Sequence, residues 1–145
     1  MGGDSGMNLL LVEDDDVAAE AVMRGLRKHG LLWPVILAAD GATALEILRG
    51  DHATLRIGKP RLMLLDLNMP GMNGIELLRQ LRADEALRGT VVFVLSTSDA
   101  ENDLRMAYQQ CIAGYLVKSA LGPHLQGLAR FLAEYGRASA LPSQH

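Results

Sequence analysis

The sequence predicts one α/β domain in which a parallel sheet carries helices on both faces, a doubly wound architecture. Short, unbroken apolar runs alternate with stretches whose apolar residues recur at helical spacing, the pattern of repeated βα units. Polar residues suited to chemistry follow the apolar runs, where the carboxyl ends of parallel strands line a ligand crevice. The chain has 145 residues, which suits a single domain with one continuous core.

Five apolar runs are predicted to be strands, at residues 9–12, 35–39, 62–65, 91–95 and 115–117. Five stretches with helical periodicity are predicted to be helices, at residues 15–29, 41–48, 75–82, 99–111 and 121–135. In the first of these, Asp15 and Asp16 at the start and Lys28 near the end complement the helix macrodipole. The segment 50–60 is predicted to be an exposed loop, which is long for a connection from a helix to a strand.

Composition and charge narrow the functional classes. The net charge of −3 gives no general attraction to nucleic acid or to an anionic membrane surface. Cys111 is the only cysteine, which excludes an intrachain disulfide and a cysteine-based zinc site. No secretory signal or membrane-spanning run is present, so a cytoplasmic location is expected. We expect a disordered segment at 1–7, the domain at 8–136 and a tail at 137–145, without a fused output domain.

Five polar residues follow four of the predicted strands: Glu13 and Asp14 the first, Asp66 the third, Ser96 the fourth and Lys118 the fifth. With a strand order of 2-1-3-4-5, the first and third strands are neighbours and their three carboxylates converge. Each pair of carboxylates at ~5 Å costs about 1–3 kcal/mol. Either a proton or a cation must therefore relieve the repulsion, and an all-oxygen site suits Mg²⁺.

For each residue taken alone, a purely structural role stays open. Asp14 can simply open a helix together with Asp15 and Asp16, and a strand-end aspartate is often a loop anchor. In this company, however, Asp66 is a candidate nucleophile, because carboxylates form acyl phosphates. Phosphoryl transfer needs positioning and charge neutralisation, which Lys118 and the hydroxyl of Ser96 can supply.

The motifs resemble those of the response regulator receiver domain of two-component signalling, which has a flavodoxin-like fold. The resemblance covers residues 8–136 and rests on Leu11–Asp15, Leu65–Gly74, Leu95–Thr97 and Gly114–Lys118. The spacings also match: Gly74, Ser96 and Lys118 lie 8, 30 and 52 residues after Asp66. The long loop at 50–60 is also similar to that of stand-alone regulators that serve bacterial phytochrome histidine kinases.

The resemblance implies a role for each matching residue. Asp66 is expected to be the phosphoacceptor, and Glu13, Asp14, Asp66 and the backbone carbonyl of Asn68 are expected to bind Mg²⁺. Ser96 corresponds to the switch hydroxyl, Tyr115 to the switch aromatic and Lys118 to the salt-bridging lysine; Tyr115 can equally be an ordinary half-buried strand tyrosine. The implied partners are a histidine kinase and a downstream protein or phosphotransfer protein in a phosphorelay, and the domain is expected to turn over no separate substrate.

The sequence departs from the family pattern at two positions. Ser119 follows Lys118 where proline after a cis bond is usual; since a cis bond without proline costs about 3 kcal/mol, a trans bond and a different loop are expected. Thr97 replaces a small residue, which predicts slower hydrolysis of the phosphorylated form.

Three rival interpretations fit the sequence less well. An aspartate-nucleophile phosphatase needs a second aspartate where Asn68 stands, and a flavin protein conflicts with the acidic turn after the first strand. A degenerate receiver that only binds partners is disfavoured because the acidic residues, Ser96 and Lys118 are all present.

Output is expected through contacts on the face formed by the fourth helix, fifth strand and fifth helix, where a homodimer is possible. Phe131 lies outside the main apolar stripe of the fifth helix; it either marks this face or completes the core.

Overall fold

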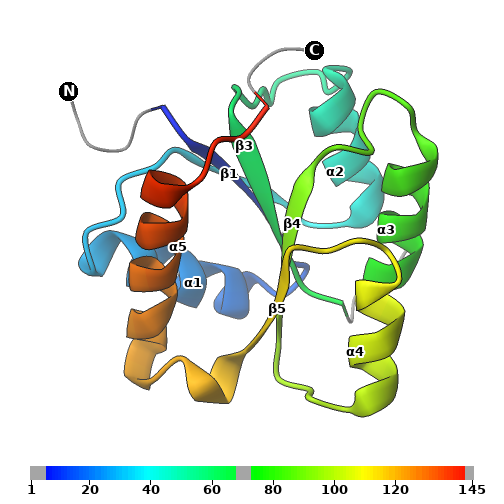
Figure 1. Cartoon of the computed structure of the whole chain (residues 1–145). Coiled ribbons are helices and arrows are strands. Elements are labelled where there is room, and N and C mark those ends of the chain that lie inside the picture. Colours follow the sequence, from blue (N-terminus) through cyan, green and yellow to red (C-terminus); the bar gives the residue numbers. More distant parts are fainter. Residues whose placement is uncertain (1–5, 68–72, 143–145) are drawn as a thin grey trace.

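A computed structural model describes residues 6–67 and 73–142 and shows a three-layer α/β domain (Figure 1). The strands are β1 (Asn8–Val12), β2 (Val35–Ala38), β3 (Arg61–Leu65), β4 (Val91–Ser96) and β5 (Gly114–Val117). They form one parallel sheet in the order β2-β1-β3-β4-β5, which confirms the predicted 2-1-3-4-5 order. The helices are α1 (Asp16–Lys28), α2 (Gly41–Arg49), α3 (Gly74–Ala83), α4 (Glu101–Tyr108) and α5 (Gln126–Ala138).

Side-chain alternation along the strands divides the core into two layers, because successive side chains of a strand point to opposite faces. Leu10, Met63 and Val92 pack in the layer beneath α2, α3 and α4. Leu9, Leu62 and Phe93 pack in the layer beneath α1 and α5. Figure 1 shows these two groups of helices on opposite sides of the sheet. Both faces are therefore buried, which explains why the strands read as continuous apolar runs rather than alternating ones.

The N-terminal boundary differs from the prediction. Met7, which was placed in a disordered segment, is 5% exposed and packs in the core layer beneath α1 and α5. Asn8 then begins β1 and fixes the chain by donating through its backbone N–H to the carbonyl of Pro60. The apolar thioether of Met7 gains from this burial, so the described fold begins before residue 8.

The fifth helix begins later than predicted. In place of a helix from Leu121, two short 3-10 turns, η1 (Lys118–Ala120) and η2 (Pro123–Leu125), precede α5. Gly122 has φ +81°, and Pro123 lacks the N–H that would continue a helix from the preceding turn. The bond after Lys118 is trans as expected, since the only cis peptide bond among the described residues precedes Pro60. α5 also continues to Ala138, beyond the predicted boundary at 136.

The fourth helix is shorter than the predicted 99–111. It begins at Glu101 and ends at Tyr108, after which Cys111 takes a left-handed φ of 59°. The loop from 51 to 60 contains no helix or strand, but it is not fully exposed, because Leu55 and Ile57 pack against the core.

Phe131 completes the core. Its ring meets Phe93 edge-on, with ring centroids 5.1 Å apart and an interplanar angle of 88°, and it stacks on Tyr135. The interpretation of Phe131 as an exposed anchor for a partner is therefore wrong.

Within residues 6–67 and 73–142, no helix is both long and apolar enough to cross a membrane.

Arg82, at the end of α3, holds two connecting segments together with one guanidinium group. It donates to the carbonyls of Gln110 (2.7 Å) and Cys111 (3.0 Å) after α4, and to those of Arg88 (2.7 Å) and Thr90 (2.8 Å) before β4. Hydrogen bonds to a charged group each contribute more than neutral ones. One side chain thus fixes the starts of β4 and β5, the strands that carry Ser96 and Tyr115.

Replacing Arg82 by methionine keeps most of the apolar stem but removes all four hydrogen bonds. We expect the free energy of unfolding in urea to fall by about 2–3 kcal/mol. Arg88→Met is the matched control: Arg88 is 58% exposed and its pairing with Glu85 is on the surface, so its effect should stay within about 0.5 kcal/mol. Equal effects of the two substitutions would contradict this role of Arg82.

Candidate metal and phosphoryl site

The site lies at the carboxyl edge of the sheet and is assembled by strand register. Val12 of β1 pairs with Leu65 of β3, and the ladder continues one step further, where the N–H of Asp66 donates to the carbonyl of Val12 at 3.1 Å. The N–H of Glu13 likewise donates to the carbonyl of Ala38 at 3.0 Å. Glu13 and Asp66 therefore occupy adjacent positions just beyond two neighbouring strands, as the sequence predicts.

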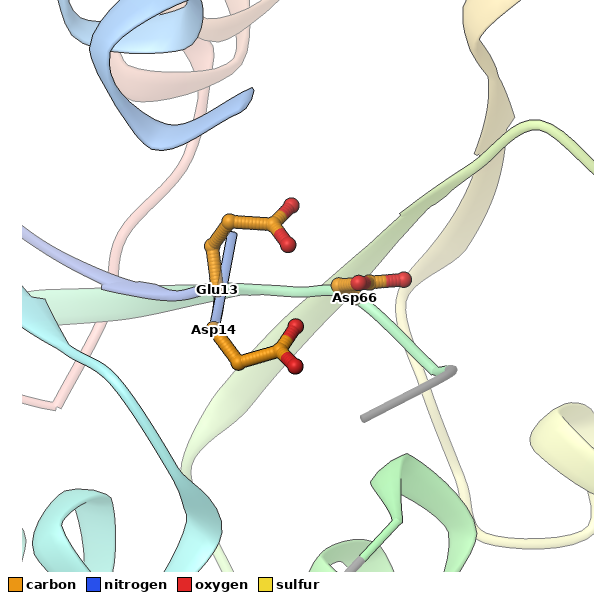
Figure 2. Close-up of side chains that lie close together, drawn as sticks. All are labelled: Glu13, Asp14 and Asp66. Carbon is orange, nitrogen blue, oxygen red and sulfur yellow. The ribbon is translucent and has the colours of Figure 1, made fainter. Parts of the chain in front are cut away.

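Three carboxylates meet at this point. Glu13, Asp14 and Asp66 each offer an oxygen, and these oxygens all lie within 4.8 Å of one another. Figure 2 shows Glu13 and Asp14 extending from the end of β1 toward the side on which Asp66 stands. Glu13 is buried (6% exposed), whereas Asp14 and Asp66 are half-buried. Asp14 and Asp66 therefore keep part of their surface exposed, whereas Glu13 does not.

The close approach of the carboxylates affects the pKa of Glu13. Burial, a hydrogen bond with Asp66 and the charge of Asp66, in that order, raise the pKa of Glu13 from 4.5 to about 7. The backbone N–H of Asp15, which donates to the Glu13 carboxylate at 3.3 Å, and the charge of Lys118 lower it in part. Near neutral pH a proton therefore competes for this cluster with any cation.

The chemistry of the donors fits a divalent metal ion. All three are carboxylate oxygens, which hard cations prefer, and a cation in their midst would offset the charge of Asp66 that, after burial and the hydrogen bond with Asp66, helps to raise the Glu13 pKa. The predicted fourth ligand, the backbone carbonyl of Asn68, lies outside the described residues.

Gly74 determines how closely the chain after Asp66 can fold back. Its N–H donates to the carbonyl of Leu67 at 2.7 Å. A Cβ at this position would lie 2.5 Å from the Cα of Leu67 and 3.0 Å from the carbonyl oxygen of Asp66. The glycine eight residues after Asp66 is thus required by close backbone approach beside the site.

The remaining predicted residues lie along the same edge. Ser96 ends β4 and is 2% exposed, and Lys118 follows β5, where Val117 pairs with Ser96. Lys118 is half-buried and lies near enough to Glu13 to lower its pKa. Tyr115 is half-buried on β5 and donates its hydroxyl to the carbonyl of Ser98 at 2.9 Å. The structure therefore brings the acidic cluster, Ser96 and Lys118 to one edge, as predicted.

Two residues near the site were not predicted. The side chain of Ser98 donates to Asp103 of α4 at 2.7 Å, and its N–H donates to the hydroxyl of Ser96 at 3.0 Å. The pattern Ser98-Asp99-Ala100-Glu101 fits a capping box, which would make Ser98 the N-cap of the helix. In the structure α4 instead begins at Glu101, after Ala100. The capping-box pattern therefore singles out Ser98 correctly, but it does not predict the bond from Ser98 to Asp103.

Comparison with known proteins decides the family. The family model of the response regulator receiver domain matches residues 9–129. The chain is a response regulator receiver. Receivers of this family are typically phosphorylated on an aspartate, and they take part in their own phosphorylation and dephosphorylation. They accept the phosphoryl group from histidine kinases and hold a divalent metal ion in an acidic pocket.

Individual relatives cover nearly the whole receiver. The probable methanogenesis regulatory protein FilR2 of Methanothrix harundinacea is 36% identical over 88% of this chain and 81% of its own. The response regulator Rcp1 of Synechocystis is 32% identical over 87% of this chain and 88% of its own.

Two solved structures resemble the receiver over 94% of its length. The crystal structure of the phosphorylated cyanobacterial phytochrome response regulator RcpA superposes with a TM-score of 0.79 at 30% identity and is covered over 98%. The crystal structure of the Mn²⁺-bound form of Rcp1 superposes with a TM-score of 0.75 at 30% identity and is covered over 99%.

The Glu13 pKa makes stability depend on pH when no cation is bound. Because the folded pKa is raised, protonation of Glu13 stabilises the fold fully below pH 4.5, and this contribution is lost as pH rises to about 7. Relative to Glu13→Gln, the receiver in a chelator should lose about 3 kcal/mol of unfolding free energy over this range. Excess Mg²⁺ should reduce the loss, since it binds the ionised form. Parallel curves for the two proteins would contradict the assignment.

Proposed function

We propose that this receiver accepts a phosphoryl group on Asp66 from a histidine kinase, dependent on Mg²⁺, and thereby changes its protein contacts in a phosphorelay. The observation that carries the proposal is the cluster of Glu13, Asp14 and Asp66, whose oxygens lie within 4.8 Å at the edge that also holds Ser96 and Lys118. Of the three carboxylates, Asp66 stands on the strand nearest β4, the strand that carries Ser96. It is therefore the best placed nucleophile.

In the proposed transfer, a carboxylate oxygen of Asp66 forms a bond to phosphorus. The bond from phosphorus to the histidine nitrogen of the kinase breaks, and the imidazole leaves with the electron pair. Lys118 and the Ser96 hydroxyl supply donors for the equatorial oxygens of the transferred group. A Mg²⁺ ion held by Glu13, Asp14, Asp66 and the Asn68 carbonyl would neutralise charge on those oxygens.

A switch role is proposed for Ser96 and Tyr115. Ser96 is buried at the end of β4, at the same edge of the sheet as the site whose charge changes on phosphorylation, and its hydroxyl accepts from the Ser98 N–H. Tyr115 is joined to the β4–α4 segment by its bond to the Ser98 carbonyl, so movement of that segment reaches the aromatic ring. One new set of charge-assisted contacts would then shift a two-state segment. The domain is proposed to act through this switch rather than by turnover of a separate substrate.

The kinase is proposed to be a bacteriophytochrome. The phytochrome response regulator RcpA, with which the chain shares 30% identity across nearly its full length, supports this. The partner on the output side is proposed to be a downstream protein or a phosphotransfer protein.

The phosphoacceptor assignment predicts that Asp66→Asn removes phosphorylation by a cognate kinase or by acetyl phosphate. The amide retains the shape of the side chain but is a poor nucleophile. Asp51→Asn, an exposed residue after α2, should retain the wild-type level and serves as the control. Label that persists in Asp66→Asn, measured by acid-labile phosphate or intact mass, would refute the assignment.

The exposed Thr97 follows Ser96 directly, and its branched side chain is expected to restrict access of water to the phosphoryl group. Thr97→Ala should therefore shorten the half-life of the phosphorylated form several-fold, as measured by loss of label after removal of the donor. Thr54→Ala, an exposed threonine in the 51–60 loop, should leave the half-life unchanged. An unchanged half-life in Thr97→Ala would count against the steric role.

The face of α4, β5 and α5 is proposed as the output surface and as a homodimer contact. Ser96 and Tyr115 border it, and Tyr108 at the end of α4 is 52% exposed. Addition of beryllofluoride and Mg²⁺, which mimic the phosphoryl group, should shift the sedimentation of the protein toward a dimer. A monomer both with and without beryllofluoride would remove the dimer proposal.

A further inference from the structure

Ser98, in the segment between β4 and α4, is joined to three separate parts of the receiver. Its N–H donates to the hydroxyl of Ser96 at 3.0 Å, and its carbonyl accepts from the hydroxyl of Tyr115 at 2.9 Å. Its own hydroxyl donates to the carboxylate of Asp103 at 2.7 Å. One residue thus contacts the end of β4, the ring on β5 and the first turn of α4.

The bond between Ser98 and Asp103 is the strongest of these contacts. A hydroxyl that donates to a carboxylate forms a charge-assisted hydrogen bond, and 2.7 Å is a short distance for it. Both residues are half-buried, so water competes less for the two groups than it would at an exposed position. The same hydroxyl accepts the N–H of Ala100 at 3.2 Å, which fixes its orientation.

Few other polar contacts are available to hold the start of α4. Ala100 occupies the N-cap position of this helix, and no side chain caps its first turn. By contrast, Asp15, Asp40 and Asn73 cap α1, α2 and α3 through their own side chains. The position of the first turn of α4 therefore depends on the Ser98–Asp103 bond in a way that α1, α2 and α3 do not require; α5 also begins without a side-chain cap.

We propose that Ser98 is a positioning residue that couples the Ser96 hydroxyl to the position of α4. The inference rests on the proposed function, in which Ser96 responds to the phosphoryl group on Asp66. Because the Ser98 N–H is bonded to Ser96, a displacement of that hydroxyl shifts Ser98. The Ser98 side chain passes the shift to Asp103, and its carbonyl passes the shift to Tyr115.

Such a coupling acts in both directions. If a phosphoryl mimic at the site changes the affinity of α4 for a partner, then that partner must change the affinity of the site for the mimic by the same factor. The Ser98–Asp103 bond is thus the proposed route between the phosphoryl site and the output surface, and its removal should uncouple the two without removing either.

The test is amide hydrogen exchange of the α4 peptide, residues 101–108, in the full chain with and without beryllofluoride and Mg²⁺. In the wild type, the phosphoryl mimic should change the exchange rates of this peptide. In Ser98→Ala and in Asp103→Ala, the change should fall by about half or more, and the double variant should lose no more than either single one. Ser98→Thr keeps the hydroxyl and should restore the wild-type response.

Asp99→Ala is the matched control, because Asp99 is exposed on the same segment and its loss changes the charge equally. It should respond as the wild type does. An α4 response that is absent in the wild type, or that survives undiminished in both Ser98→Ala and Asp103→Ala, would overturn the coupling. If beryllofluoride and Mg²⁺ do not raise the free energy of unfolding of the wild type, the proposed phosphoryl site is refuted instead. Failure of the coupling and failure of the proposed function are therefore distinguishable.

Discussion

The repulsion among Glu13, Asp14 and Asp66 is the interaction on which the rest of the site depends. The parallel register of β1 and β3 forces their oxygens to within 4.8 Å, at a cost of about 1–3 kcal/mol for each pair. Without a cation, burial of Glu13, its hydrogen bond with Asp66 and the charge of Asp66 together raise the pKa of Glu13 to about 7, so a proton can relieve the repulsion. The repulsion lowers the stability of the fold, and either a divalent cation or a proton can relieve it. Metal binding, protonation and stability are therefore linked at this site.

The surrounding elements fix the cluster and leave the neighbouring segment adjustable. Close approach at Gly74 and the ladder bond from Asp66 to Val12 hold the carboxylates in place. On the other side, β4 passes into a segment held by single side-chain bonds through Ser98 rather than by a helix cap. An acidic site held by strand register beside a segment without a side-chain helix cap suits a phosphorylation switch, because the charge change must move a segment without unfolding the domain.

The sheet and the placement of the candidate site residues could be predicted from the sequence, because both follow from the apolar runs and the polar residues that end them. Continuous apolar runs define the strands, and strand order then places Glu13, Asp66, Ser96 and Lys118 at one edge. Features that depend on contacts between distant segments were not predictable in this way. The burial of Met7 requires the layer beneath α1 and α5, and the position of Phe131 requires Phe93 on β4.

The start of α5 and the role of Ser98 show a second limit. Apolar spacing continues through Leu121 and Leu125 as if the helix were unbroken, but Gly122 and Pro123 interrupt the backbone. A capping-box pattern at Ser98 was outweighed by the bond to Asp103. In both places two local signals compete: Gly122 and Pro123 prevail over the apolar spacing, and a side-chain bond to a residue five positions later prevails over the capping box.

The most direct measurement of the central claim is to locate the phosphoryl group chemically. Borohydride reduces an aspartyl phosphate to homoserine, and peptide mass mapping of the phosphorylated and reduced protein then identifies the modified position. The structure predicts conversion at Asp66 alone, dependent on Mg²⁺ during phosphorylation. Conversion at Asp14 or Glu13, or a phosphorylated protein in which residue 66 remains aspartate, would contradict the account.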